Sequence, residues 1–167
     1  MSTVSQTVHR SNKWLYALHI GFFAGLIWGG IQSLLYYFEM TEWFPAFLAE
    51  PFYKHEYLQS TEGRVLGWLY FILFSILASF IYTLFLAKFN GPWIGLIYGF
   101  AWWVIIAVAI GPFMGIIEPI TRVSLNTMTT EFCLFLLWGI FIGYSITLEF
   151  NDERKREPEP LTKMLNK

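Results

Sequence analysis

Four long apolar stretches divide the chain, and shorter polar stretches separate them. They cover residues 14–38, 65–86, 92–113 and 132–150, and the second and third carry no charged side chain. A helix of about 20 apolar residues crosses a hydrocarbon core of about 30 Å, because each residue rises about 1.5 Å. None of the stretches alternates between apolar and polar residues, as the strands of a membrane barrel do. The pattern predicts an all-α integral membrane protein, a bundle of four spanning helices over residues 14–150.

Composition agrees with this prediction. Of the 167 residues, 56% are hydrophobic and 14% are charged, whereas a soluble domain carries about 25% charged residues. The net charge of -1 gives no electrostatic reason to expect nucleic acid as a partner. The lone cysteine, Cys133, excludes an internal disulfide. The partner that the composition does imply is the lipid bilayer.

The distribution of lysine and arginine predicts the orientation of the bundle. Most basic residues fall in the tail of residues 1–13, at Lys88 between the second and third helices, and in the tail of residues 151–167. The loops on the opposite side carry more acids than bases. Because basic residues favour the cytoplasmic side, we expect both termini in the cytoplasm. The second tail is charged and contains two prolines, so it is expected to be disordered.

Two connections carry structural signals. The short turn before the third helix contains Gly91 and Pro92. Glycine can close the turn, and proline suits the first position of a helix, where its missing N–H costs nothing. The second and third helices are therefore expected to be antiparallel neighbours. In the first outer loop, residues 43–52 are apolar but too short to span, so they are expected to lie in the outer interface with their apolar side towards lipid.

Glycines recur at intervals of four residues in all four helices. Twelve of the 13 belong to such pairs, and only Gly30 does not. Small residues at this spacing let two helix backbones approach closely in lipid, where little hydrophobic drive brings helices together. The pattern predicts GxxxG-type packing within the bundle, and a glycine-lined pore or an oligomer interface is the alternative. The glycines expected at helix contacts are Gly21, Gly25, Gly29, Gly67, Gly91, Gly95, Gly99, Gly111, Gly115, Gly139 and Gly143.

A weak internal repeat overlays the glycine pattern. The glycine triplet of residues 21–29 matches that of residues 91–99 at an offset of 70 residues. Such a match arises either from duplication of a helical hairpin or from convergent selection for packing. The sequence leaves both explanations open.

Polar residues gather where the third helix ends and the fourth begins. Pro112 removes a backbone hydrogen bond, so the third helix is expected to kink or end there. Glu118, Arg122 and Asn126 are spaced by four residues and would share one helical face, with the acid first, an order that favours an ion pair. Together with Glu131 they form either an outer vestibule for an ion or a headgroup, or a folded interfacial loop that caps the fourth helix. We favour the second interpretation, because charges near the interface cost little to place.

Two further pairs of polar residues lie inside the apolar stretches. His19 and Glu149 occupy similar depths near the cytoplasmic edge and together would form a proton-handling pair. The alternative is that His19 binds a carbonyl or a lipid phosphate. Gln32 and Ser33 are the strongly polar side chains in the outer half of the first helix, and interhelical hydrogen bonds explain them.

Signals of an enzyme are missing. The three histidines are far apart, and no metalloprotease, P-loop or dinucleotide-binding motif occurs. Residues 54–56 form a charged cluster in the first outer loop, which favours a solvated surface over a metal site. We therefore expect no enzymatic activity, no cofactor and no metal, and no small-molecule substrate is indicated.

Two stretches carry a resemblance to a known family. Residues 25–28 in the first helix, and residues 126–130 running into residues 137–150 of the fourth, resemble the YqhR family of small conserved membrane proteins from spore-forming Gram-positive bacteria. The resemblance spans about residues 14–152 and leaves out the tails. It implies a bacterial cell membrane and no catalytic residue, because the family has no established activity.

These patterns favour a structural or interaction component of the bacterial cell envelope. It would act as an oligomer, or as a subunit of a complex with another membrane protein. The alternative is a small channel or transporter with Glu118, Arg122 and Glu131 at its outer vestibule. A transport path requires polar groups through the midplane, where the second and third helices offer little besides Ser75 and Ser79.

Overall fold

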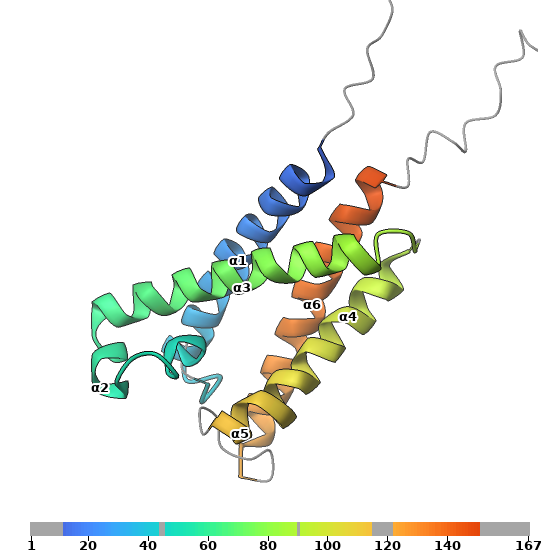
Figure 1. The fold of residues 1–167 in the computed structure, drawn as a ribbon. Coiled ribbons are helices and arrows are strands. Elements are labelled where there is room, and N and C mark those ends of the chain that lie inside the picture. Colours follow the sequence, from blue (N-terminus) through green and yellow to red (C-terminus); the bar gives the residue numbers. More distant parts are fainter. Residues whose placement is uncertain (1–11, 44–45, 90, 115–121, 151–167) are drawn as a thin grey trace, which may run out of the picture.

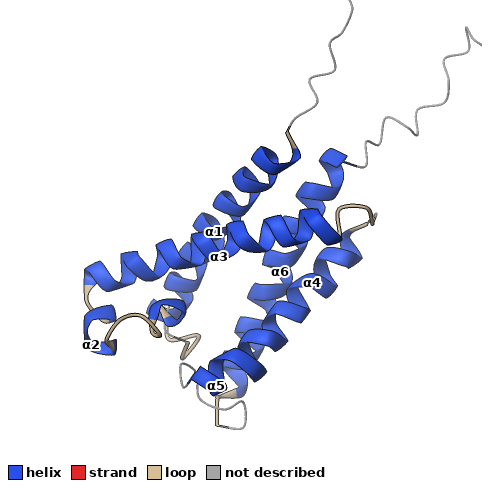
Figure 2. Ribbon diagram, in the orientation of Figure 1, coloured by secondary structure: helices blue, strands red, loops and turns tan. Residues whose placement is uncertain are grey.

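The chain folds into helices joined by short loops. A computed structural model describes residues 12–43, 46–89, 91–114 and 122–150, and no strand occurs in them (Figures 1 and 2). The predicted tails lie almost wholly outside these residues, so the expected disorder of residues 151–167 is not addressed. The elements in chain order are α1 (Lys13–Tyr37), η1 (Phe47–Ala49), α2 (His55–Leu58), α3 (Thr61–Phe85), α4 (Pro92–Val104), η2 (Ile105–Ile110), α5 (Gly111–Met114) and α6 (Leu125–Phe150).

The four predicted spans correspond to four helical stretches that are long and apolar enough to cross a membrane. The first is α1, the second is α3, the third runs through α4 and η2, and the fourth is α6. Their bounds are Lys13–Tyr37, Thr61–Phe85, Pro92–Phe113 and Leu125–Glu149.

Serine caps extend two of the helices beyond their predicted spans. Ser60 Oγ accepts a backbone N–H in the first turn of α3 at 3.1 Å, and Ser124 Oγ accepts one in the first turn of α6 at 3.2 Å. Such caps satisfy N–H groups that the first turn of a helix leaves unpaired. As a result α3 begins at Thr61 rather than residue 65, and α6 begins at Leu125 rather than residue 132. Glu131, expected near the helix terminus, lies inside α6.

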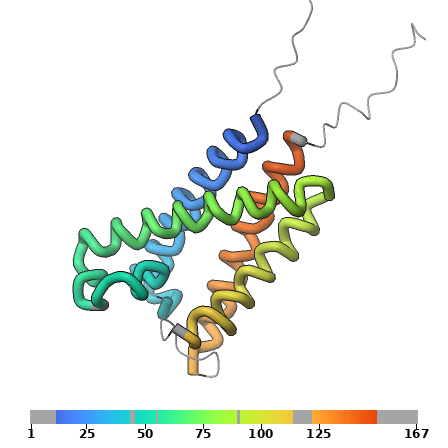
Figure 3. The backbone as a smooth tube through the Cα atoms, viewed as in Figure 1, coloured from blue at the N-terminus to red at the C-terminus, as the bar shows by residue number. Residues whose placement is uncertain are grey.

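The turn between α3 and α4 forms as predicted, and these two helices touch through side chains rather than through close backbone contact. Gly91 adopts φ 109°, a conformation that favours glycine, and Pro92 opens α4. The close backbone pairs are α1 with α3 and α4 with α6, whereas α3 runs across the other long helices (Figure 3). The helices α3 and α4 are nevertheless neighbours, because the hydroxyl of Tyr98 on α4 donates to the carbonyl oxygen of Ala78 on α3 at 2.7 Å. Bulky rings fill the space beyond the turn: those of Phe74 and Trp102 lie 4.9 Å apart.

The backbones of α1 and α3 meet at two glycines. A Cβ atom on Gly21 would lie 2.5 Å from the Cα atom of Ile76, and one on Gly25 would overlap the Cα atom of Ile72. No larger residue fits at either position unless a helix moves, because helix interfaces in lipid rely on close packing.

The backbones of α4 and α6 meet at four glycines. A Cβ atom on Gly139 would lie 2.5 Å from the Cα atom of Gly99, and one on Gly143 would lie 2.6 Å from the Cα atom of Gly95. A Cβ atom on Gly99 would overlap the carbonyl oxygen of Phe135. The glycines of each helix therefore let the backbone of the other helix approach closely.

Several predicted contact glycines have a different role. Gly91 has no atom within 4 Å of a Cβ position, so it serves the turn and no helix contact. Gly67 faces Ala46 of the outer loop, and Gly29 faces the ring of Trp68, rather than a second helix backbone. Gly111 is buried, and Gly115 lies outside the described residues.

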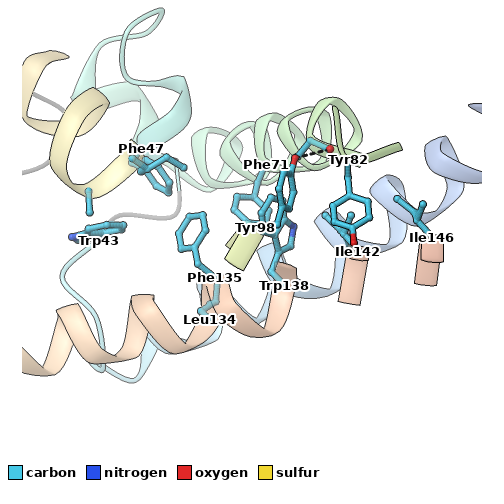
Figure 4. Packing of buried hydrophobic residues seen from close by; sticks show 14 residues of the cluster. Trp43, Phe47, Phe71, Tyr82, Tyr98, Leu134, Phe135, Trp138, Ile142 and Ile146 are labelled. Atoms are coloured by element: carbon cyan, nitrogen blue, oxygen red, sulfur yellow. Dashed lines mark hydrogen bonds between the residues drawn. The ribbon is translucent and has the colours of Figure 1, made fainter. Parts of the chain in front are cut away.

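An aromatic core fills the middle of the bundle. Trp138 is fully buried, its ring lies 5.5 Å from that of Phe74 and 5.9 Å from that of Phe135, and its Nε1 donates to Ser75 Oγ at 3.0 Å. Tyr98 packs beside it (Figure 4). Such ring pairs contribute about 0.5–1.5 kcal/mol each beyond the area they bury.

The third span changes its helical pitch before Pro112. Residues Ile105–Ile110 form a π-helix, and helical structure continues through α5 to Met114. Proline lacks an N–H and its ring clashes with the carbonyl four residues earlier, which is Val108. A wider π-helical turn accommodates this disturbance, so Pro112 alters the helix without ending it at once.

Part of the apolar segment of residues 43–52 packs into the protein. The exposed fractions are 5% for Trp43, 2% for Phe47 and 0% for Ala49. Gly67 of α3 leaves the space that Ala46 occupies. Phe52 of the same segment is 71% exposed, residues 44–45 lie outside the described residues, and the position of the segment in the outer interface stays a prediction.

Candidate functional site

A cluster of buried polar groups lies at the end of the bundle opposite the α3–α4 turn (Figure 1). We call it the Glu131 cluster. Gln32 comes from α1, Thr41 and Trp43 from the loop that follows α1, and Thr127 and Glu131 from successive turns of α6. The exposed fraction of Glu131 is 0% and that of Gln32 is 2%. Three segments distant in sequence therefore bring polar side chains to one protected point.

One oxygen of Glu131 organises the hydrogen bonds. Glu131 Oε1 accepts from Gln32 Nε2 at 2.7 Å and from Thr41 Oγ1 at 2.5 Å. Gln32 Nε2 also lies 3.4 Å from the carbonyl oxygen of Trp43, whose own N–H donates to Thr41 Oγ1 at 3.1 Å. Hydrogen bonds to a carboxylate are stronger than those between neutral groups, so the cluster ties α1 and the loop to α6.

The loop is fixed to α6 at a second point. The backbone N–H of Glu42 donates to Thr127 Oγ1 at 3.0 Å, and Thr127 is 1% exposed. Thr127 and Glu131 are four residues apart, so they share one face of α6. This face holds both bonds to the loop.

Among the described residues, three polar atoms of the Glu131 cluster have no hydrogen-bond partner: Glu131 Oε2, Gln32 Oε1 and Trp43 Nε1. The groups that bond Glu131, Gln32 and Thr41, are uncharged. A buried carboxylate is costly without a counter-charge or further hydrogen bonds. A proton on the carboxyl of Glu131 would remove the cost of its buried charge.

Metal binding has no support in the described part of the chain. No three histidine, cysteine, aspartate or glutamate residues there lie close enough together to hold a metal ion. The Glu131 cluster contributes a single carboxylate and otherwise neutral amide, hydroxyl and indole groups, a poor set for a divalent cation.

The predicted outer vestibule is not assembled as a helical face. Glu118 lies outside the described residues. Arg122 is exposed in the turn before α6, while Asn126 is in the first turn of α6 and its Nδ2 donates to the carbonyl oxygen of Met40 at 3.0 Å. Arg122 and Asn126 therefore do not share a helix. Glu131, placed at the same mouth by its sequence position, is buried in the cluster.

The predicted proton-handling pair is also not formed. His19 Nδ1 lies 2.7 Å from the carbonyl oxygen of Leu15 in its own helix. Glu149 is exposed near the end of α6. The alternative interpretation, a histidine bonded to a carbonyl, describes His19.

Of the two polar residues in the outer half of α1, one makes the expected interhelical bond. Gln32 reaches Glu131 on α6, whereas Ser33 Oγ donates to the carbonyl oxygen of Gly29 within α1 at 3.0 Å. Sequence reasoning missed that Thr41 and Trp43 join them. The available signal was an acid in an apolar helix and a glutamine in another, since polar groups at membrane depth pair with one another.

Comparison with known proteins places this architecture in a family. The family model described as "Conserved membrane protein YqhR" matches residues 5–160. The chain belongs to the YqhR family. The match extends further into both tails than the resemblance over residues 14–152 predicted, so parts of the tails belong to the YqhR pattern.

A curated relative agrees with the family model. It is the "Uncharacterized protein YqhR" of Bacillus subtilis (strain 168), 30% identical over 132 residues, which are 79% of this chain and 74% of the relative. No solved structure matches the chain. The YqhR family is thus a family of membrane proteins, and its description names no activity.

Proposed function

We propose that this protein is a non-catalytic structural and interaction component of the bacterial cell envelope. It resides in the cell membrane and acts as an oligomer or as a subunit of a larger membrane complex. The observation that carries the proposal is the separation of the buried carboxyl group from the aromatic core. Glu131, the one charged side chain that is buried among the described residues, lies at one end, while the Trp138, Phe74 and Tyr98 rings fill the middle beside small hydroxyl side chains such as Ser75 and Ser79.

This separation does not favour a channel or transporter. A path for ions requires polar groups along its length. Among the described residues, the largest fully buried side chain is the indole of Trp138, and its N–H is already bonded to Ser75. A bundle with a packed aromatic core is better suited to present a surface to a protein partner than to conduct a solute.

Both termini are proposed to lie in the cytoplasm. Lys13 at the start of α1 and Lys88 after α3 are basic and lie at the end of the bundle where α6 finishes (Figure 1). The Glu131 cluster and the α2 loop would then face the outside, in agreement with the positive-inside tendency.

The proposed packing of the bundle is of the GxxxG type. Gly21 and Gly25 on α1, and the glycines of α4 and α6, occupy positions where a Cβ atom would collide with the facing helix. Because these glycines are used inside the bundle, the surface for a partner must lie elsewhere. The outer end offers exposed aromatic residues: Phe52 is 71% exposed and Tyr57 is 44% exposed, and aromatic side chains are enriched at protein interfaces.

Photo-crosslinking in living cells tests the proposal. A photoreactive amino acid at position 52 or 57 should give a discrete protein adduct, of this chain or of another membrane protein. The matched control is position 89 at the opposite end, where Phe89 is 54% exposed; it should give none. Lipid adducts alone at all three positions would contradict an interaction role.

A further inference from the structure

A groove between α1 and α3 opens at the end of the bundle that holds the Glu131 cluster. The two helices cross at the glycine contacts and diverge towards this end (Figure 1). The groove has a volume of about 1030 Å³, and Gly30 of α1 lies in its wall opposite Trp68 of α3. Gly30 is the one glycine outside the four-residue pattern, and its missing side chain widens the groove.

Both walls of the groove change from apolar to polar in the same direction. On α1 the lining runs from Ile27 and Ile31 to Tyr37 and Glu39, and on α3 it runs from Trp68 to Arg64. Along α1, ten residues from Ile27 to Tyr37 rise about 15 Å, half the thickness of a hydrocarbon core of about 30 Å. The groove therefore has the length and polarity gradient of one lipid leaflet.

The polar rim of the groove carries charges of both signs. Arg64 faces it from α3, and Glu39 and Glu42 face it from the end of α1 and the loop. All three are exposed, so their charged ends are accessible. A guanidinium binds a phosphate through paired hydrogen bonds, and a carboxylate accepts the N–H groups of a primary ammonium.

The position of one rim carboxylate is held at a conformational cost. Glu39 has φ 57°, the left-handed conformation that glycine adopts readily, and it is the one non-glycine residue with positive φ among those described. Such strained residues concentrate at functional sites. The conformation ends α1 and turns the chain so that Thr41 and Glu42 line the groove.

The floor of the groove is held by the Glu131 cluster. Thr41 lines the groove, is 4% exposed, and donates its Oγ1 hydrogen to Glu131. Glu42 is held through its backbone N–H by Thr127. The buried cluster thus positions one acidic wall of the rim, which gives the groove a preformed shape.

We propose that this groove binds one bilayer phospholipid whose headgroup carries a phosphate and a primary amine, as in phosphatidylethanolamine. Arg64 binds the phosphate, Glu39 and Glu42 bind the ammonium group, and an acyl chain lies along Ile27, Ile31 and Val65. A lipid with a net negative headgroup is disfavoured by the two carboxylates, and a trimethylammonium headgroup has no N–H to donate. The proposal does not depend on which protein the scaffold binds.

Lipid retention from vesicles tests the proposal. The full-length protein is reconstituted in vesicles of equal parts phosphatidylethanolamine, phosphatidylcholine and phosphatidylglycerol with identical acyl chains. It is then extracted in mild detergent, and the retained lipid is quantified by mass spectrometry. We expect enrichment of phosphatidylethanolamine of about three- to tenfold, the factor that one or two charge-assisted hydrogen bonds provide.

Four variants locate the lipid. Arg64→Gln and Glu39→Gly should each lose most of the enrichment, and Gly30→Leu should lower total retained lipid by filling the groove. Lys54→Gln changes a charge in the first outer loop, outside the groove. This variant should keep both the phosphatidylethanolamine enrichment and the total retained lipid of the wild type. Glu39→Gly also relieves the strained backbone, so its thermal stability should not fall, which separates lipid binding from folding. Equal retention of the three lipids, preference for either of the other two, or enrichment that survives the groove variants would overturn the proposal.

Discussion

Gln32 Nε2 donates a hydrogen bond of 2.7 Å to Glu131 Oε1, although 99 residues separate them in the chain. Both side chains are buried, and the bond joins the outer half of α1 to the second turn of α6. Thr41 donates to the same oxygen. The carboxyl group of Glu131 therefore joins α1, the loop after α1 and α6 at the end of the bundle where the loops are longest.

Removing either partner of this bond should destabilise the protein. We expect a double-mutant cycle of Gln32→Leu and Glu131→Ala to show a coupling of about 1–3 kcal/mol, because each single variant leaves a buried polar group unpaired. In thermal unfolding, each kcal/mol corresponds to about 2–4 °C in Tm for a chain of this size. Ser33→Ala is the matched control, since Ser33 bonds only within α1 and its loss should change Tm little. Strictly additive single effects would show that the two residues act independently.

Two serines one turn apart on α3 should differ sharply in their importance. Ser75 Oγ accepts the indole N–H of Trp138, whereas Ser79 Oγ is buried without a hydrogen-bond partner in the part of the chain that the structure describes. Ser75→Ala should cost about 1–3 kcal/mol by leaving the indole N–H unsatisfied, and Ser79→Ala should cost little. Thermal unfolding followed by tryptophan fluorescence compares them, and the reverse ranking would contradict the geometry of the aromatic core.

Alanine at two glycines should also have opposite outcomes. A Cβ atom on Gly99 would overlap the carbonyl oxygen of Phe135, while one on Gly30 would have its nearest neighbour at 3.4 Å, in Trp68. Gly99→Ala should therefore destabilise by about 1–3 kcal/mol, the usual range for overpacking. Gly30→Ala should be neutral or slightly stabilising, because alanine favours helix more than glycine does. Equal Tm values for the two variants would exclude a close α4–α6 contact at Gly99.

The four membrane spans could be predicted from the sequence alone. The thickness of the hydrocarbon fixes the length and polarity of a span, so the four apolar stretches could be located directly. The turn between α3 and α4 could also be predicted, since the conformation of Gly91 and the place of Pro92 follow from their own covalent structure.

Pairing of elements was harder to predict. The short α3–α4 turn implied a packed hairpin, yet the volume of the Phe74 and Trp102 rings decides how the helices diverge. Hydrophobicity alone does not distinguish a segment that faces lipid from one that faces protein, so the burial of Trp43 and Phe47 was not foreseen.

The candidate site was visible only in part. Gln32 stood out as a polar residue in an apolar helix and Glu131 as an acid beside the start of another, but their pairing depends on how α1 and α6 meet, which periodicity does not specify. Thr41 gave no signal, because a threonine next to acids in a loop is ordinary. The spacing of Arg122 and Asn126 suggested a shared helical face, but Arg122 lies in the turn before α6, which begins at Leu125.

The distinction between a closed scaffold and a conducting protein can be measured in vesicles. Wild-type protein and Glu131→Ala are reconstituted at equal density, and proton and cation flux is recorded with a fluorescent indicator under an imposed gradient. A bundle filled by aromatic rings and closed by a structural carboxyl predicts no flux above protein-free vesicles for either protein, with a lowered Tm for the variant. A wild-type flux that Glu131→Ala abolishes would contradict the account.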